Sequence, residues 1–222
     1  ITGGKLFNSG SKELEGGANL GFTGKFGFMN AGFDFIRRRL NIHEDPEEDP
    51  LATPNQQVNT SQYSADADFI LGKNFKIEPV VSYQQQTRIE YESDDERQTG
   101  TEALHLDLST FEGTIKLHHS INKYFSGTSG ISYSSQLNRS IAEDKLIPNY
   151  NAGTIGIFAA ENLDLGKLSI SAGIRFDSKK LNIEETVFQY DTTGNPLNVV
   201  NAQSLSFNSF TGSVGAVYNP SK

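Results

Sequence analysis

Apolar and polar side chains alternate along most of this chain. The clearest case is the segment at residues 167–181. Its apolar positions share one face of an extended strand and are Leu168, Ile170, Ala172, Ile174 and Phe176. The positions between them carry polar side chains or glycine, and this period of two predicts a strand with one apolar and one polar face. In a strand tilted by about 45° from the membrane normal, the nine residues from Leu168 to Phe176 cover roughly 21 Å of membrane thickness.

Similar alternation, less regular in places, predicts eight further strands. They cover residues 12–23, 26–40, 61–71, 75–91, 111–121, 124–137, 152–163 and 205–218. Pro79 lacks a backbone donor, which predicts a bulge or a break in the ladder. The apolar parity switches between Leu108 and Phe111, so a bulge or the end of the apolar belt is expected near Ser109–Thr110.

The connections between these strands alternate in length. Tight turns are expected near Gly24, Lys73, Asn122 and Gly166, and long loops at residues 41–60, 92–103, 138–149 and 188–203. Short turns on one side and long loops on the other are typical of outer-membrane barrels. We therefore expect an all-β fold, an antiparallel up-and-down transmembrane β-barrel of which this chain holds about nine to ten strands. The polar end of one strand, Gln84–Tyr91, is expected to project above the membrane.

Composition agrees with strands that have one polar and one apolar face. Of the 222 residues, 36% are hydrophobic, yet 10% are aromatic. A polar lumen inside an apolar belt explains both values; a soluble β-sandwich explains them less well. The net charge of −8 argues against nucleic acid as a partner. No stretch reaches the roughly 18 apolar residues of a membrane-spanning helix, and the absence of cysteine excludes thiolate chemistry.

The ends of the chain indicate an internal section of something larger. Ile1–Lys5 shows no basic segment followed by an apolar core, and Tyr218–Lys222 has the composition of another turn. We expect residues 1–222 to be one section of a barrel domain, with the signal peptide and any plug domain outside it.

Several segments resemble a known family. Phe158-Ala159-Ala160-Glu161 and Gly173-Ile174-Arg175-Phe176-Asp177 resemble the hairpin of TonB-dependent outer-membrane receptors, in which Phe-x-x-Glu precedes Gly-Leu-Arg-Tyr-Asp. Gly215-Ala216-Val217-Tyr218 resembles the Gly-x-x-Tyr of the following strand. Gly16–Leu20, the turn at Gly24–Phe28 and the acidic loop after His43 are similar to the zinc- and metal-uptake branch. The resemblance covers about residues 12–220.

The resemblance implies a barrel of about 22 strands closed by a plug. It also implies active uptake of a scarce nutrient, here a metal ion or metal chelate, in the outer membrane of a Gram-negative bacterium. The implied partners are outer-membrane lipid, the remainder of the barrel and the plug, TonB acting through that plug, and a small nutrient ligand. No organic cofactor is expected. The rival functions are a passive porin or adhesin barrel and a soluble β-barrel or sandwich binding protein.

One loop combines imidazole with carboxylates. The candidate metal ligands are His43, Glu44, Asp45, Glu47, Glu48 and Asp49. Imidazole and carboxylate together suit zinc or a similar divalent ion, and the extracellular ends of the strands are where a receptor would capture it. The alternative is a solvated acidic loop.

Two further sets of residues have open roles. Neighbouring residues of a strand point to opposite faces, so His118 is expected in the lumen, as a candidate way-station for metal or as polar lining, and His119 near the membrane interface. Arg37–Arg39 could bind anionic headgroups or an anionic chelate, but pairing with the loop carboxylates that follow is the preferred interpretation. The sequence shows no catalytic set and no convincing helix, so enzyme activity is not expected.

Overall fold

The computed structural model describes residues 6–43, 53–142 and 145–220, and nearly all of its regular structure is antiparallel sheet. One sheet of nine strands dominates. In spatial order its strands are β1 (Ser11–Gly24), β2 (Gly27–Asn41), β3 (Asn55–Leu71), β4 (Phe75–Tyr91), β5 (Leu104–Ser120), β6 (Phe125–Ser140), β7 (Tyr150–Asp164), β8 (Leu168–Ile183) and β11 (Gln203–Tyr218). Each strand pairs with the next along the chain, except that β11 follows β8 because a hairpin intervenes.

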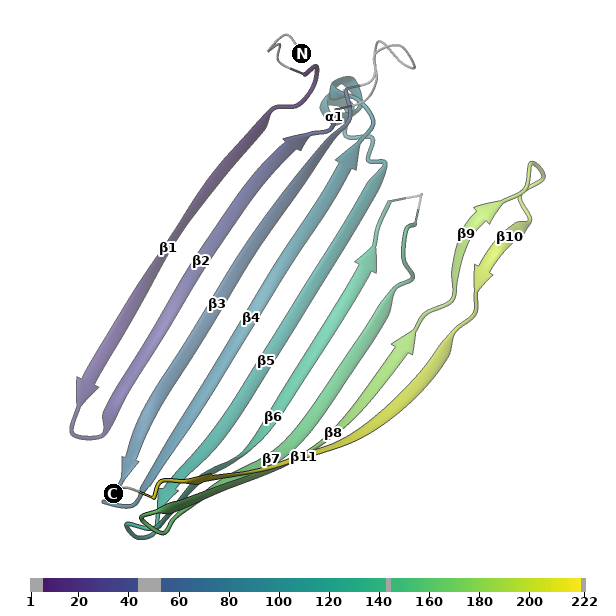
Figure 1. Ribbon diagram of the computed structural model, residues 1–222. Helices are drawn as coiled ribbons and strands as arrows, with labels where there is room; N and C mark the ends of the chain where they lie inside the picture. Colours follow the sequence, from purple (N-terminus) through teal and green to yellow (C-terminus); the bar gives the residue numbers. More distant parts are fainter. Residues whose placement is uncertain (1–5, 44–52, 143–144, 221–222) are drawn as a thin grey trace.

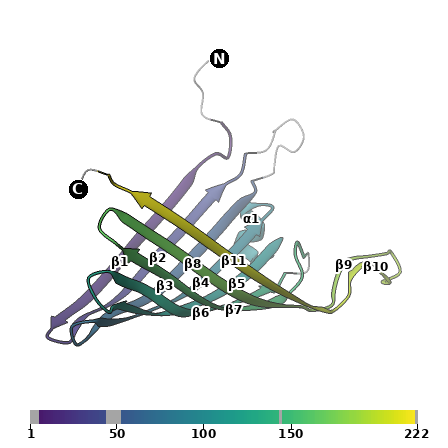
Figure 2. The same ribbon diagram turned by 60° about the horizontal axis from the view of Figure 1, so that its bottom comes forward.

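The nine strands form a single curved layer. Figure 1 shows them side by side with a common tilt, and the turned view of Figure 2 shows how the sheet bends. Within the described residues β1 and β11 are the two edges of this open sheet. All nine predicted strands are present, so the expected meander is confirmed; β3 and β5 begin earlier than predicted, at Asn55 and Leu104.

Two of the predicted long loops, at residues 92–103 and 188–203, contain regular structure. A short helix, α1 (Asp94–Thr99), lies between β4 and β5, so the expectation that the chain has no helix was wrong. The second loop is mostly a hairpin of β9 (Thr186–Tyr190) and β10 (Pro196–Val200), which forms a separate two-stranded sheet. Figure 1 shows this hairpin projecting at the long-loop end of the strands.

Neither predicted bulge is present. The pairing of β5 with β4 and with β6 runs without a shift past Ser109 and Thr110. Beside Pro79 the ladder to β3 is interrupted with the same register on both sides of the gap, so the alternative prediction for Pro79, a break in the ladder, is confirmed. The change of apolar parity in β5 therefore marks the upper limit of the apolar belt and not a slip of the strand.

The sheet has one apolar and one polar face. Its pairing register places Leu20, Met29, Ala65, Val81, Ile115, Ile157 and Ile174 on the same face. Most of these side chains are exposed; Ile174, for example, has 57% of its surface accessible. Because few apolar residues are buried anywhere in the described ranges, this face is not half of a globular core. An exposed apolar face on long strands is what a lipid-facing barrel surface requires.

A row of aromatic side chains borders the apolar belt on the side of the long loops. Phe33, Tyr63, Tyr83 and Phe111 stand directly opposite one another on four consecutive strands. Tyr133 continues the row at a centroid distance of 6.2 Å from Phe111. Above this row the same face turns polar, with a hydrogen bond of 2.6 Å from Thr87 to Asp107. Such aromatic rows mark the membrane–water interface of barrels.

The opposite end of the sheet carries tight turns at all four predicted places. Gly72 and Gly166 adopt φ angles of 74° and 85°, which residues with a Cβ rarely adopt. At the first turn Gly27 has φ 122°, and a Cβ there would lie 1.8 Å from the carbonyl oxygen of Asp68. No helix in the described ranges is long and apolar enough to cross a membrane.

Candidate functional site

The polar face carries a chain of ion pairs near the turn end of β3, β4 and β5. Lys76 bridges Asp68 at 3.1 Å and Glu78 at 3.8 Å, and Lys116 donates to Glu78 at 2.7 Å. Neighbouring positive and negative side chains compensate one another, so this wall is hydrophilic without a strong net charge. In a barrel it would face the lumen.

His118 belongs to this cluster. Its Nε2 donates to Glu78 at 2.8 Å, and its Nδ1 lies 2.9 Å from the hydroxyl of Thr128. Both ring nitrogens are therefore engaged, and a metal would have to displace one of these partners. His118 shares the polar face with Lys116, as its parity predicts; the geometry favours polar lining over a ligand role.

A second polar group lies where β6, β7 and β8 meet. Arg175 donates to Asp177 at 2.6 Å and to Ser132 at 2.9 Å, and its guanidinium lies 5.5 Å from the centre of the Phe158 ring. Gly156 leaves room for this group, since a Cβ there would be 2.4 Å from both Arg175 and Asp177. The neighbouring depression, about 420 Å³, is lined by Glu112, Thr114, Lys116, Ser132, Tyr133, Ser134, Thr154, Phe158 and Arg175.

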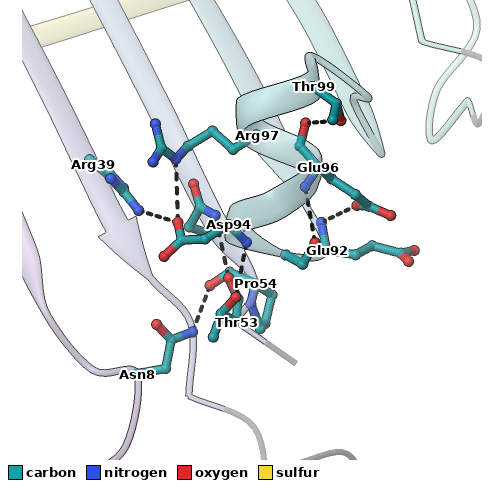
Figure 3. Close-up of polar contacts among 11 residues, drawn as sticks. Asn8, Arg39, Thr53, Pro54, Glu92, Asp94, Glu96, Arg97 and Thr99 are labelled. Carbon is teal, nitrogen blue, oxygen red and sulfur yellow. Dashed lines mark hydrogen bonds and ion pairs between the residues drawn. The ribbon is translucent and has the colours of Figure 1, made fainter. Parts of the chain in front are cut away.

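The long-loop end is organised around α1. Ser93 caps the helix by accepting from the Glu96 amide at 3.1 Å, and the Glu96 carboxylate accepts from the Glu92 amide at 3.1 Å. Asp94 in turn accepts from Arg39 of β2 at 2.6 Å, and its amide donates to the hydroxyl of Thr53 at 2.9 Å. Figure 3 shows these contacts joining α1 to strand β2 and to the residues that precede β3.

The base of the predicted metal-binding loop is closed by hydrogen bonds. Asn8 donates to the carbonyls of Ile42 and Pro54 at 2.7 and 2.9 Å. His43 lies beside them, with Nδ1 2.7 Å from the carbonyl oxygen of Phe7. A carbonyl only accepts, so Nδ1 carries the proton, and the neutral ring then presents the Nε2 lone pair.

The other predicted ligands of this loop, Glu44, Asp45, Glu47, Glu48 and Asp49, lie outside the described residues. Within the described ranges no group of three or more His, Asp or Glu side chains is placed to hold a metal ion. The metal site therefore remains a prediction, of which the structure describes only the His43 position.

Two of the three consecutive arginines pair with other elements. Arg38 bonds Glu13 of β1, and Arg39 bonds Asp94 of α1. The acidic loop that was expected to neutralise them lies largely outside the described residues. These two guanidinium groups therefore tie β2 to its neighbours at the loop end, a role that sequence proximity did not indicate.

The loops after β6 and β8 are also joined. Arg139 donates to Glu184 at 2.5 Å, and Asn149 donates to the same carboxylate at 3.4 Å. The hydrogen bond from Arg139 holds the pKa of Glu184 below its ordinary value. In the β9–β10 turn, hydrogen bonds from Asn195 and Thr193 lower the pKa of Asp191 strongly.

Sequence reasoning missed the β9–β10 hairpin. On this hairpin the side chains of Tyr190 and Leu197 are 60% and 62% exposed. The signal was Asp191-Thr192-Thr193-Gly194 between two short segments rich in β-formers, with Gly194 at φ 85°. It also missed His105, whose Nδ1 lies 2.6 Å from Glu102. Both features add to the surface at the loop end.

Together the features of the sheet define the class of protein to which this chain belongs. The apolar face, the aromatic row, the polar face and the alternation of tight turns with long loops make this chain a section of a transmembrane β-barrel. The family described as "TonB dependent receptor-like, beta-barrel" matches residues 6–222. The chain belongs to this family, whose members lie in the bacterial outer membrane and are transporters, not enzymes.

Solved structures share the fold at low sequence identity. The ferric-catecholate import receptor Fiu from E. coli K12, in its open form, has a TM-score of 0.75 at 10% identity, over 98% of this chain and 46% of that one. The ferric yersiniabactin uptake receptor FyuA from Yersinia pestis has a TM-score of 0.71 at 11% identity, over 95% and 36%. The FrpB iron transporter from Neisseria meningitidis has a TM-score of 0.66 at 15% identity, over 99% and 36%.

The chain thus spans less than half the length of these receptors. Their identities are low enough that the likeness concerns the fold alone. No curated protein matches the chain.

Proposed function

We propose that this chain is the section of a receptor barrel that captures and admits a metal ion or metal chelate, imported with energy from TonB. The observation that carries the proposal is the division of the sheet into a lipid-facing belt, a polar inner wall and a structured loop end within a receptor family. The remaining strands and a plug that contacts TonB would be supplied by residues outside this chain.

The choice of metal as cargo rests on the His43 loop. An imidazole that donates one N–H to a backbone carbonyl and presents its other nitrogen is the usual arrangement of a metal-binding histidine. Five carboxylates follow within six residues, from Glu44 to Asp49. This donor set favours zinc or a similar divalent ion. The receptors named above are described as handling ferric chelates or iron, so a ferric chelate is the alternative cargo.

Zinc capture is tested on the whole receptor. Replacing His43 with Ala, Glu44 with Gln and Asp45 with Asn should weaken zinc binding measured by calorimetry. A control variant removes three carboxylates elsewhere at the loop end, one more than the first variant, through Glu92→Gln, Asp95→Asn and Glu185→Gln. Unchanged zinc affinity in the first variant, or an equal loss in the control, would contradict a site at this loop.

Energised import is tested in cells. Uptake of radiolabelled zinc, and separately of a radiolabelled ferric catecholate, is compared between strains with and without TonB. We expect accumulation of one of them to require both this receptor and TonB. Equal accumulation in the two strains would favour the rival function, a passive barrel, because diffusion through a pore needs no energy source.

A further inference from the structure

One hydrogen-bonded His–Glu pair lies on the apolar face, and the proposed transport function assigns it no role. His119 of β5 donates from Nε2 to Oε2 of Glu161 on β7, at 2.9 Å. The two strands are not neighbours, since β6 runs between them. The pair therefore crosses a whole strand on the lipid-facing side of the sheet.

The crossing is possible because the intervening position is glycine. Gly127 of β6 stands opposite both His119 and Glu161 in the pairing register. A Cβ at Gly127 would lie 2.1 Å from Oε2 of Glu161, so any side chain would displace the carboxylate. Three neighbouring strands thus supply an imidazole, a glycine without a side chain and a carboxylate at the same level of the sheet.

The location is the rim of the belt at the turn end. His119 is one residue from the end of β5, and Glu161 is three residues from the end of β7. Leu117 and Leu163 flank the pair on the same face, and the ring of Phe125 lies 5.7 Å from the imidazole. In family barrels the short turns are periplasmic, so the pair faces the headgroup region of the periplasmic leaflet.

Each partner has one polar atom left for a ligand. Within the described residues Oε1 of Glu161 and Nδ1 of His119 make no hydrogen bond. The side chains are 34% and 12% exposed, so lipid can reach the carboxylate and the edge of the ring. A carboxylate oxygen accepts, so Oε1 of Glu161 can take an N–H from a ligand.

We propose that this pair is a binding site for a zwitterionic phospholipid headgroup that carries a primary ammonium. The ammonium would donate to Oε1 of Glu161, while His119 holds that carboxylate in place through Oε2. The acyl chains would lie on the adjoining apolar face. Charged groups at a membrane-facing position are costly unless they are paired or reach the interface, and the site satisfies both requirements.

The test uses the full-length receptor and three lipids with identical acyl chains. Native mass spectrometry measures the retention of phosphatidylethanolamine, phosphatidylglycerol, which has no ammonium, and phosphatidylcholine, whose quaternary ammonium has no N–H. We expect the wild type to prefer phosphatidylethanolamine about fivefold or more, the value of one net hydrogen bond. Glu161→Gln should remove that preference, and His119→Gln should reduce it, because the carboxylate then loses the partner that holds it in place.

The control is Asp66→Asn, which removes a carboxylate from the polar face, where Asp66 accepts from Asn30 at 3.1 Å. It should keep the wild-type preference. If Glu161→Gln fails to fold, Glu161→Asp withdraws the carboxylate while keeping the charge and should reduce the preference. A wild type without lipid preference would overturn the proposal. Gln variants that lower thermal stability equally in all three lipids and keep the preference would also overturn it, because the pair would then only link β5 to β7.

Discussion

Phe33 and Tyr63 stand opposite each other on β2 and β3, with their ring centres 4.9 Å apart and their planes inclined by 38°. This contact begins the aromatic row that runs across the sheet. Below it the exposed face is apolar, and above it the same face carries polar side chains. The pair therefore marks the level at which the barrel wall leaves the hydrocarbon region.

Removing this aromatic pair should reveal direct coupling. In a double-mutant cycle of Phe33→Ala and Tyr63→Ala, we expect a coupling free energy of about 0.5–1.5 kcal/mol in favour of the pair. Denaturant unfolding of the receptor in bilayers measures it. Phe22→Ala combined with Phe210→Ala removes two aromatic side chains from strands far apart in the sheet and should show coupling near zero. Equal coupling in both cycles would mean that the rings do not interact specifically.

Gly156 should be needed for the Arg175–Asp177 ion pair. Because a Cβ at Gly156 would lie 2.4 Å from both partners, Gly156→Ala is expected to destabilise the receptor by about 1–3 kcal/mol. The matched control is Gly215→Ala on β11, where no atom lies within 4 Å of the added Cβ. Thermal unfolding of the two variants side by side measures the difference. A similar change for both would show that the close contact at Gly156 has no energetic consequence.

The cap of α1 should determine whether the helix forms. A helix of six residues has little stability of its own, so Ser93→Ala, which costs about 1 kcal/mol at an N-cap, should open it. The expected result is faster hydrogen exchange at the amides of Arg97 and Thr101, which donate to Ser93 and Glu96. Gln98→Ala changes an exposed residue of the same helix and should leave the exchange unchanged. Protection retained in Ser93→Ala would show that the contacts of Asp94 with Arg39 and Thr53 hold the helix without the cap.

The loop contact between Arg139 and Glu184 should weaken in acid. The pKa of Glu184 is lowered in the folded protein, so its contribution is fully present above the ordinary value of 4.5 and declines as the pH falls from there towards the folded value. Hydrogen exchange at the Glu184 amide, which donates to Asn149, should therefore show extra opening below pH 4.5. Glu184→Gln should abolish that pH-dependent component, whereas Glu185→Gln should retain it. An identical pH profile in wild type and Glu184→Gln would contradict the assignment.

Much of this fold could be predicted from the sequence because one physical signal dominates it. Lipid on one side and water on the other impose strict alternation, and this pattern located all nine strands and placed His118 and His119 on opposite faces. The pattern is uninformative where both faces meet water. That explains why the upper part of β5, with Leu104 and Leu106 on the polar-face parity, was interpreted as a possible bulge.

The features that sequence reasoning missed depend on local or tertiary contacts. The Ser93-x-x-Glu96 capping box was present in the sequence, but a six-residue helix gives no hydrophobic period to recognise. The partners of Arg38 and Arg39 are distant in sequence, and so is Glu161 from His119. Spacing alone could not identify these pairs, because the strand register that joins them is set by the whole sheet.

The most direct test of the account is the sidedness of the two ends of the sheet. This chain contains no cysteine, so single cysteines can be introduced at Thr193, in the β9–β10 turn, and at Lys73, in the tight turn between β3 and β4. Cells expressing the full-length receptor are treated with a membrane-impermeant maleimide, with the parent protein as background. We predict that Thr193→Cys is labelled in intact cells and that Lys73→Cys is labelled only after the outer membrane is permeabilised. Labelling of Lys73→Cys from outside, or of neither position until permeabilisation, would contradict a barrel section that presents its long loops to the exterior.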